Sequence, residues 1–142
     1  MEAFKLINFK KANNAEMPIV RSMQGGECEA VRQALLSRCH AESLEAFFEM
    51  EEREAVLLDG MNAENDDFNW NRVFDSIGIA VPHEVYINFG RFESIDVFLF
   101  EDFCNYFDDI WYPAVDDMEV FDATLTWLVS VRHYGAVFYK KI

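Results

Sequence analysis

Residues 118–140, MEVFDATLTWLVSVRHYGAVFYK, contain the pattern that decides the fold. Apolar side chains recur there in short runs, which predicts three strands at residues 118–121, 125–132 and 136–140. The last two runs are separated by residues 133–135 alone. Such a short connection requires antiparallel pairing, because a parallel return needs a crossover of about a dozen residues. This part of the chain therefore predicts an antiparallel sheet.

Two further strands are expected before this region. In residues 84–90 and 95–100 aliphatic or aromatic side chains recur at every second position, which is typical of a strand. Helical spacing returns at residues 101–110 and has to end before Pro113, because the residue before a proline avoids the helical conformation.

The first half of the chain is expected to be mainly helical. Residues 27–40 repeat their apolar side chains at a spacing of four, which predicts an amphipathic helix. A second helix is expected from an N-cap at Ser43 to about Ala55. A third is expected from a cap at Asp67 to a stop at Gly78.

Weaker patterns complete the prediction. Residues 4–9 could form a short first strand, and residues 13–26 are expected to be a loop because they contain several Gly, Pro and Asn residues. We therefore predict an α+β fold, with N-terminal helices packed on a mainly antiparallel C-terminal sheet. The 142 residues fit one domain that spans residues 1–142.

The charge of the chain limits its partners. Asp and Glu number 26 against 12 Lys and Arg, which gives a net charge of −14 at pH 7. Direct binding to nucleic acid or to an anionic membrane is not expected, because both would repel this protein. A basic protein partner is favoured, and long-range attraction would speed the encounter at low salt.

The cysteines and the chain start indicate the compartment. Cys28, Cys39 and Cys104 are spaced like no metal motif, and we expect three buried free thiols in a reducing environment. Residues 1–11 do not have the pattern of a signal peptide, and no apolar run reaches the ~20 residues of a membrane helix. We therefore expect a cytoplasmic protein.

Between Phe92 and Val131 the chain has no Lys or Arg, although it carries ten Asp or Glu residues and ten aromatic residues. Solvated surfaces normally mix both signs, because interspersed bases relieve the repulsion between carboxylates. A stretch that keeps this repulsion indicates that a positively charged partner binds there.

A recognition surface is expected where the 101–110 helix gives way to the next strand. Carboxylates there can pair with Arg or Lys of a partner, and Trp and Tyr supply contact area at low entropic cost. The predicted partner-binding residues are Asp108, Asp109, Trp111, Tyr112, Asp116, Asp117, Glu119 and Asp122. We expect reversal of Asp116 and Asp117 to Lys to change stability little, as exposed substitutions usually do.

Two alternatives stay open for these acidic residues. The loop could be merely solvated, with Trp111 packed in the core. A second acidic surface could also form on the helix that bears Glu45, Glu49 and Glu52.

No catalytic or metal-binding motif is recognisable. The histidines share no motif with a Cys or Ser nucleophile, and adjacent helical residues such as Cys39 and His40 point in different directions. Residues 116–122 lack the Gly and the ligand spacing of a calcium loop. A carboxylate pair for hydrolysis would be indistinguishable from the surrounding excess of acids. We therefore expect no enzymatic activity, no metal and no cofactor.

The segment from Asp108 to Gly135 follows the pattern DDIWYPxxDDxxxFDxxxxWxxxxxHxG. In this pattern the chain resembles immunity proteins of bacterial polymorphic toxin systems, including contact-dependent growth inhibition. The resemblance implies a cytoplasmic inhibitor that binds a cognate toxin domain, commonly a basic nuclease. It supplies no catalytic residues. The alternative is an acidic nucleic-acid mimic that inhibits a DNA-binding or host-defence protein, and the oligomeric state stays open.

Overall fold

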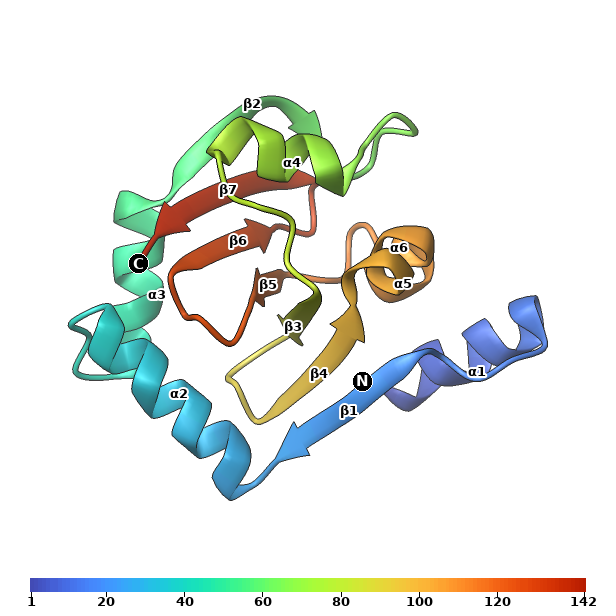
Figure 1. Cartoon of the computed structure of the whole chain (residues 1–142), viewed down its shortest axis with the longest axis horizontal. Helices are drawn as coiled ribbons and strands as arrows, with labels where there is room; N and C mark the ends of the chain where they lie inside the picture. The colour runs from blue at the N-terminus through green and yellow to red at the C-terminus, as the bar shows by residue number, and fades with distance from the viewer.

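The computed structural model describes all 142 residues of the chain. Six helices and seven strands form one structure built around a single sheet (Figure 1). The helices are α1 (Ala3–Asn13), α2 (Gly26–Arg38), α3 (Leu44–Glu54), α4 (Trp70–Ile77), α5 (Phe100–Asn105) and α6 (Phe107–Ile110). The strands are β1 (Ile19–Gln24), β2 (Val56–Asn62), β3 (Glu84–Asn88), β4 (Ser94–Leu99), β5 (Met118–Phe121), β6 (Trp127–Val131) and β7 (Ala136–Lys141). The α+β prediction is confirmed.

The strands are ordered β1-β4-β3-β5-β6-β7-β2, and every neighbouring pair is antiparallel. The predicted C-terminal strands β5, β6 and β7 lie side by side, and Val131 faces Val137 across the short turn between the last two. The two further strands that were expected are β3 and β4, and they pair as an antiparallel hairpin. The first two strands of the chain stand at opposite edges of the sheet.

The sequence-based prediction was wrong at both edges of the sheet, since β1 falls in an expected loop and β2 was not predicted. Both strands pair irregularly: the register shifts between Ile19 and Arg21 in β1 and between Leu57 and Asn62 in β2. In β1 only Met23 is buried, and β2 has no buried residue. An edge strand with so little burial carries no strict alternation of apolar residues, so the pattern that identified the other strands is missing.

Residues 4–9, expected as a short strand, belong to helix α1 instead. The buried residues of α1 are Lys5 and Phe9, which lie one helical turn apart. The ring of Phe9 packs edge-to-face against Tyr106 at 5.0 Å between centroids. The clustered apolar residues fit either structure locally, and packing against α5 and α6 decides for the helix.

The helix boundaries follow the cap residues, with one correction. Ser43 accepts a hydrogen bond from a backbone N–H in the first turn of α3, and Gly78 ends α4 in the left-handed conformation. Both were predicted. The N-cap of α4 is Asn69 and not Asp67. The helix expected over residues 101–110 is split into α5 and α6.

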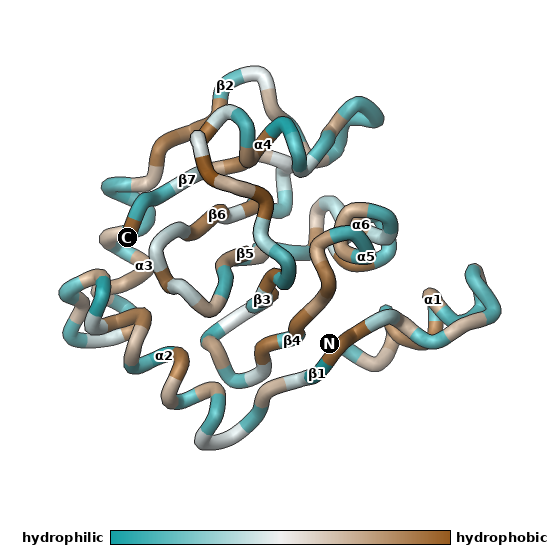
Figure 2. Tube along the Cα trace, in the orientation of Figure 1, coloured by the Kyte–Doolittle hydropathy of each residue, from teal (hydrophilic) through white to brown (hydrophobic).

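Helices cover both faces of the sheet. Side chains such as Trp70 of α4 and Phe103 of α5 pack with Val129 of the sheet on one face. On the other face Leu35 of α2 and Phe47 of α3 pack against residues that alternate with those of the first face. Figure 2 shows apolar residues along the strands, whereas the loop between β2 and α4 is mainly hydrophilic. That loop contributes to the site described below.

The three cysteines are free thiols, as predicted, but only Cys28 is buried, whereas Cys39 and Cys104 are half-buried. Burial raises the pKa of the Cys104 thiol to about 11. A thiol with so high a pKa stays protonated near neutral pH and is a poor nucleophile. None of the helices combines the length and the apolar character needed to cross a membrane.

We expect Gly135→Ala to destabilise the protein. Gly135 has a φ of +90°, and a Cβ at this position would lie 1.9 Å from Oδ1 of Asn62. The substitution combines backbone strain with displacement of Asn62, and it should lower the free energy of unfolding by about 1–3 kcal/mol. Urea denaturation measures this change. Gly90→Ala is the matched control, because its added Cβ meets nothing within 4 Å, and equal losses in the two variants would contradict the explanation.

Candidate functional site

The turn between β6 and β7 joins two other loops through backbone hydrogen bonds. Ala63 N donates to the carbonyl oxygen of Gly135 at 2.8 Å, and Ala114 N donates to that of His133 at 2.7 Å. The antiparallel order explains this meeting, because β2 and β6 end where β5 and β7 begin. The surface formed by these loops is termed the three-loop surface; it comprises residues 63–69, 112–117 and 133–135.

Apolar side chains are exposed on the three-loop surface. Val115 is 65% exposed and Tyr134 is 55% exposed. Tyr112 is half-buried, and its ring packs edge-to-face on Phe4 of α1 at 5.6 Å. Exposed aromatic and aliphatic side chains that gather in this way are typical of a protein-binding surface.

Carboxylates border these apolar side chains. Phe68 of the first loop packs against Phe107 of α6 at 5.3 Å between ring centroids, which brings the acids of α6 close to the loop. The carboxylates of this border, termed the acidic rim, are Glu64, Asp66, Asp67, Asp108 and Asp109. None of them forms an ion pair. The three loops contain no Lys or Arg. The nearest base to the first loop is Arg72 of α4, which lines the same small pocket as Asp67 without forming an ion pair with it.

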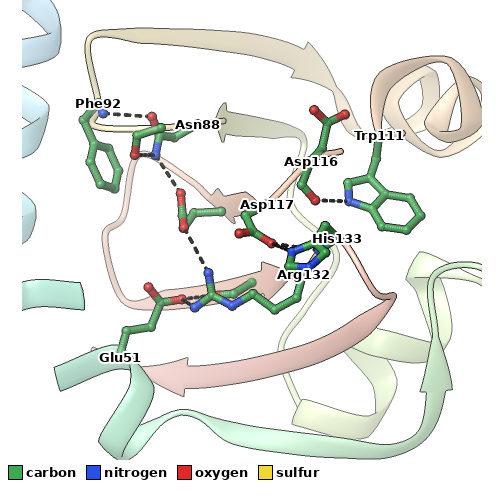
Figure 3. Close-up of polar contacts among 11 residues, drawn as sticks. Glu51, Asn88, Phe92, Trp111, Asp116, Asp117, Arg132 and His133 are labelled. Atoms are coloured by element: carbon green, nitrogen blue, oxygen red, sulfur yellow. Dashed lines mark hydrogen bonds and ion pairs between the residues drawn. The ribbon is translucent and has the colours of Figure 1, made fainter. Parts of the chain in front are cut away.

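Asp116 lies in the interior and organises the connection between α6 and β5. One of its carboxylate oxygens accepts hydrogen bonds from Lys5 Nζ at 2.6 Å and from Tyr112 N at 2.7 Å. Its backbone carbonyl accepts a hydrogen bond from Trp111 Nε1 at 2.9 Å (Figure 3). Lys5 also donates to the carbonyl oxygen of Ile110 at 2.9 Å. A buried charge requires such partners, and here they fix the path of the second loop.

Asp117 and Asp122, two further acids of the predicted partner-binding set, accept hydrogen bonds within turns. Asp117 accepts hydrogen bonds from both the backbone N and the ring Nδ1 of His133. Desolvation alone would raise the pKa of Asp117, but the hydrogen bonds from His133 outweigh it and lower that pKa. Asp122 lies beyond the other end of β5, where its side chain accepts a hydrogen bond from Thr124 N at 2.9 Å.

A row of polar side chains crosses the face of the sheet that α3 covers. Asn88 faces Glu119, and Glu119 faces Ser130, in adjacent strands of the sheet. Asn88 Nδ2 donates to Glu119 Oε2 at 2.6 Å. All three residues are buried. Their alignment follows from antiparallel register, which places directly opposed residues on the same face.

Glu51 and Arg132 complete this buried network. One carboxylate oxygen of Glu51 accepts a hydrogen bond from Ser130 Oγ and lies 3.2 Å from Nη2 of Arg132. Nη1 of Arg132 lies 3.8 Å from Oε1 of Glu119. Figure 3 shows Arg132 extended between the two carboxylates. The network therefore contains two acids and one base in a region largely closed to water.

Burial raises the pKa of both acids. Desolvation, strengthened by the charge of Glu51, raises the pKa of Glu119 to about 8. Desolvation also raises the pKa of Glu51, although Ser130 and Arg132 oppose this change. Glu119 is therefore mostly protonated at neutral pH, which leaves Arg132 paired mainly with Glu51.

The predicted partner-binding residues thus separate into three groups. Trp111, Asp116 and Glu119 are between 2% and 7% exposed, so the prediction that they contact a partner has to be corrected. Reversal of Asp116 to Lys in particular would destabilise the protein, because the Asp116 carboxylate accepts hydrogen bonds from Lys5 Nζ and Tyr112 N. Tyr112 and Asp117 belong to the three-loop surface, and Asp108 and Asp109 to its rim. Asp122 lies elsewhere.

Sequence reasoning missed several residues of this surface. Glu64 and Asp66 were not singled out and Asp67 was expected only as a helix cap, since all three lie outside the base-free stretch. Tyr134 was treated as a turn residue. The lack of Lys and Arg in all three loops is the signal that could have identified them, but it becomes visible only when the loops are known to meet.

No group of three or more His, Cys, Asp or Glu side chains is arranged to hold a metal ion. Comparison with known proteins found no matching family model, no matching curated protein and no matching solved structure.

We expect Lys5→Met to be strongly destabilising. Lys5 is 1% exposed and Asp116 is 7% exposed, so the variant leaves a buried carboxylate without its cation. Breaking a buried pair in this way costs about 3–5 kcal/mol of unfolding free energy. The matched control is Lys10→Met, which breaks the exposed pair with Glu16 and should cost less than about 1 kcal/mol. Urea denaturation of both variants tests this, and similar losses would contradict it.

We expect Glu119→Gln to reduce the pH dependence of stability. The folded protein holds the Glu119 proton up to a pKa of about 8, against an ordinary value of 4.5. The unfolded chain releases this proton first, so the free energy of unfolding falls as the pH rises through this interval. Gln keeps an acceptor for Asn88 and cannot ionise.

The variant should therefore lose less stability than the wild type between about pH 5 and pH 8, by at least about 1 kcal/mol. Urea denaturation at both pH values measures the difference. Glu101→Gln, at an exposed position, is the control and should behave like the wild type. A Glu119→Gln variant with the wild-type pH dependence would refute the buried, protonated state.

Proposed function

We propose that this protein is an immunity protein, which binds a cognate basic toxin domain, most simply a nuclease, and blocks its active or substrate-binding site. The observation that carries the proposal is the three-loop surface with its acidic rim. Exposed Val115 and Tyr134 stand beside carboxylates that have no basic partner within the chain. The resemblance of residues 108–135 to immunity proteins supports the same conclusion.

The physical basis of inhibition is charge mimicry. A nuclease binds the phosphates of its substrate with Lys and Arg, and carboxylates of the acidic rim would occupy the same positions. The apolar side chains would supply the buried centre of the interface, which the charged border surrounds. The net charge of −14 would also attract a basic domain over a distance and speed association.

The same charge supports an alternative, an acidic nucleic-acid mimic that inhibits a DNA-binding or host-defence protein. Exposed apolar residues near the acids favour the toxin-binding function, because mimicry of phosphates requires negative charge but no apolar contact area. The free thiols fit action in the cytoplasm, where cysteines stay reduced.

The test is to search beside the gene of this protein for one that encodes a toxin, and to measure binding to the toxin domain found there. In the variant Asp66→Lys/Asp67→Lys the rim loses two carboxylates and gains two bases. Affinity measured by calorimetry should fall at least about 30-fold, which corresponds to about 2 kcal/mol. The association rate should also fall as salt rises, because screening shortens the range of the attraction.

The matched control is Glu42→Lys/Glu49→Lys, which makes the same change of charge at exposed positions near α3. Its affinity should change less than about 3-fold, which is within the usual effect of a remote charge. A larger loss in the control than in the rim variant would move the interface to the acidic helix. Absence of binding to the toxin domain would refute the proposed function.

A further inference from the structure

An open cavity of about 590 Å³ lies between α3 and the end of β7, which stand beside each other in Figure 1. The last residue of α2 and the turn that follows it form a third side. The volume falls within the range of small-molecule sites, about 300–1,000 Å³. The cavity shares no residue with the three-loop surface or the acidic rim, so a ligand bound here goes beyond the proposed function.

The wall of this cavity reverses the charge of the protein as a whole. Four of the 12 Lys and Arg residues of the chain line it, but only two of the 26 Asp and Glu residues do. The bases are Arg38, Arg53, Lys140 and Lys141, and the acids are Glu49 and Glu54. The bases remain in excess when the terminal carboxylate of Ile142 is counted as a third negative charge. A cleft lined mainly by one sign of charge concentrates its field on a ligand of the opposite sign.

The acids of the wall do not neutralise its bases. The carboxylate of Glu54 pairs with Lys140 Nζ at 2.9 Å and also with Arg53 Nη2 at 3.5 Å. The hydrogen bond and the charge of Lys140 lower the pKa of Glu54, so this acid is ionised near neutral pH. Two cations therefore share one negative charge. Arg38 and Lys141 form no ion pair at all.

A ligand can reach all four basic groups. Three of them are exposed, and Lys140, the least accessible, is still 20% exposed. Burial and the charge of Glu51 raise the pKa of Cys39 in the wall, which places Glu51 close behind it. Glu51 is paired with Arg132 and is not part of the wall. Acids farther away act weakly on a bound anion, because salt at about 0.15 M screens charges beyond about 8 Å.

Apolar side chains form the rest of the wall. Ala46 and Met50 contribute from α3, and Cys39 and Ala41 from the turn after α2. Sites for small molecules typically combine apolar walls with a few polar groups that fix the orientation of the ligand. Phosphate suits the basic part, because Arg and Lys bind it through charge-assisted hydrogen bonds. An apolar group attached to the phosphate then has a surface on which to pack.

We propose that this cavity binds a phosphorylated small organic molecule. The phosphate pairs with the bases of the wall, foremost with Arg38 and Lys141, which have no acidic partner. The organic part packs on the apolar wall beside Met50. A nucleic acid does not fit this site, because a long chain of phosphates would extend from the cavity over the acidic surface and be repelled there.

The experiment uses phenyl phosphate as the probe. It is titrated into the full chain at physiological salt, with backbone amide NMR signals as the readout. We expect saturable shifts at Cys39, Met50 and Lys141, with a dissociation constant in the millimolar range. Benzyl alcohol has the ring without the phosphate and should cause no saturable shift. Inorganic phosphate lacks the ring and should bind at least about threefold more weakly, because it buries no apolar surface.

Two double variants test the assignment of residues. Arg38→Gln/Lys141→Gln removes the two unpaired bases and should weaken phenyl phosphate at least about tenfold. The matched control, Lys11→Gln/Arg72→Gln, removes the same charge at exposed positions outside the cavity and should change the affinity less than about twofold. All four positions are exposed and form no ion pair, so both variants should keep the fold, which the amide spectrum reports.

Several results would overturn the site. Shifts that do not saturate, or equal shifts with benzyl alcohol, would exclude recognition of the phosphate. Equal affinity for inorganic phosphate would exclude a role for the apolar wall. Equal losses in the two double variants would show that the net charge of the protein, and not this cavity, determines binding. None of these results depends on a toxin domain, so the proposed function stands or fails separately.

Discussion

A single carboxylate, that of Asp116, joins helix α1 to the second loop of the three-loop surface. It connects Lys5, near the start of the chain, to Tyr112 in the connection before β5. Lys5 Nζ also lies 3.8 Å from the centre of the Phe89 ring. These groups are removed from water, so their interactions with one another replace the hydrogen bonds that water would otherwise provide. The position of α1 and the shape of the second loop therefore depend on one buried ion pair.

The central part of the fold could be predicted from the sequence because local and tertiary preferences agree there. In β3 and β4 the alternation of side chains matches the two buried faces, and the turn at residues 133–135 is too short for a parallel return. At the edges of the sheet the local sequence preferences and the tertiary structure no longer agree. Val20 and Val56 are exposed apolar residues in strands that bury little, so nothing in their local pattern distinguishes a strand from a loop. Residues 4–9 were misassigned for the same reason.

The roles of the acidic residues were harder to predict than the strands, because Asp and Glu can be either buried structural residues or exposed surface residues. Asp116 and Glu119 lie in the same base-free stretch as Asp108, yet the first two are structural and the third is largely solvated. Burial separates them, and burial depends on contacts with Lys5 and Arg132 from distant parts of the chain. Local sequence could therefore predict an acidic surface but could not identify which carboxylates form it. The exposed acids repel one another without compensation, and that repulsion is a cost in stability that a basic partner would remove.

The irregular pairing of β1 and β2 bears on aggregation. A sheet with two free edges presents unpaired backbone groups to other molecules, and a flat edge would recruit further copies into a fibril. The register shifts at Ile19/Arg21 and Leu57/Asn62 interrupt both edges. Each interruption removes positions at which an incoming strand could pair in sequence, and the like charge of every copy adds repulsion between molecules. Both features would oppose edge-to-edge pairing between copies of this open seven-stranded sheet.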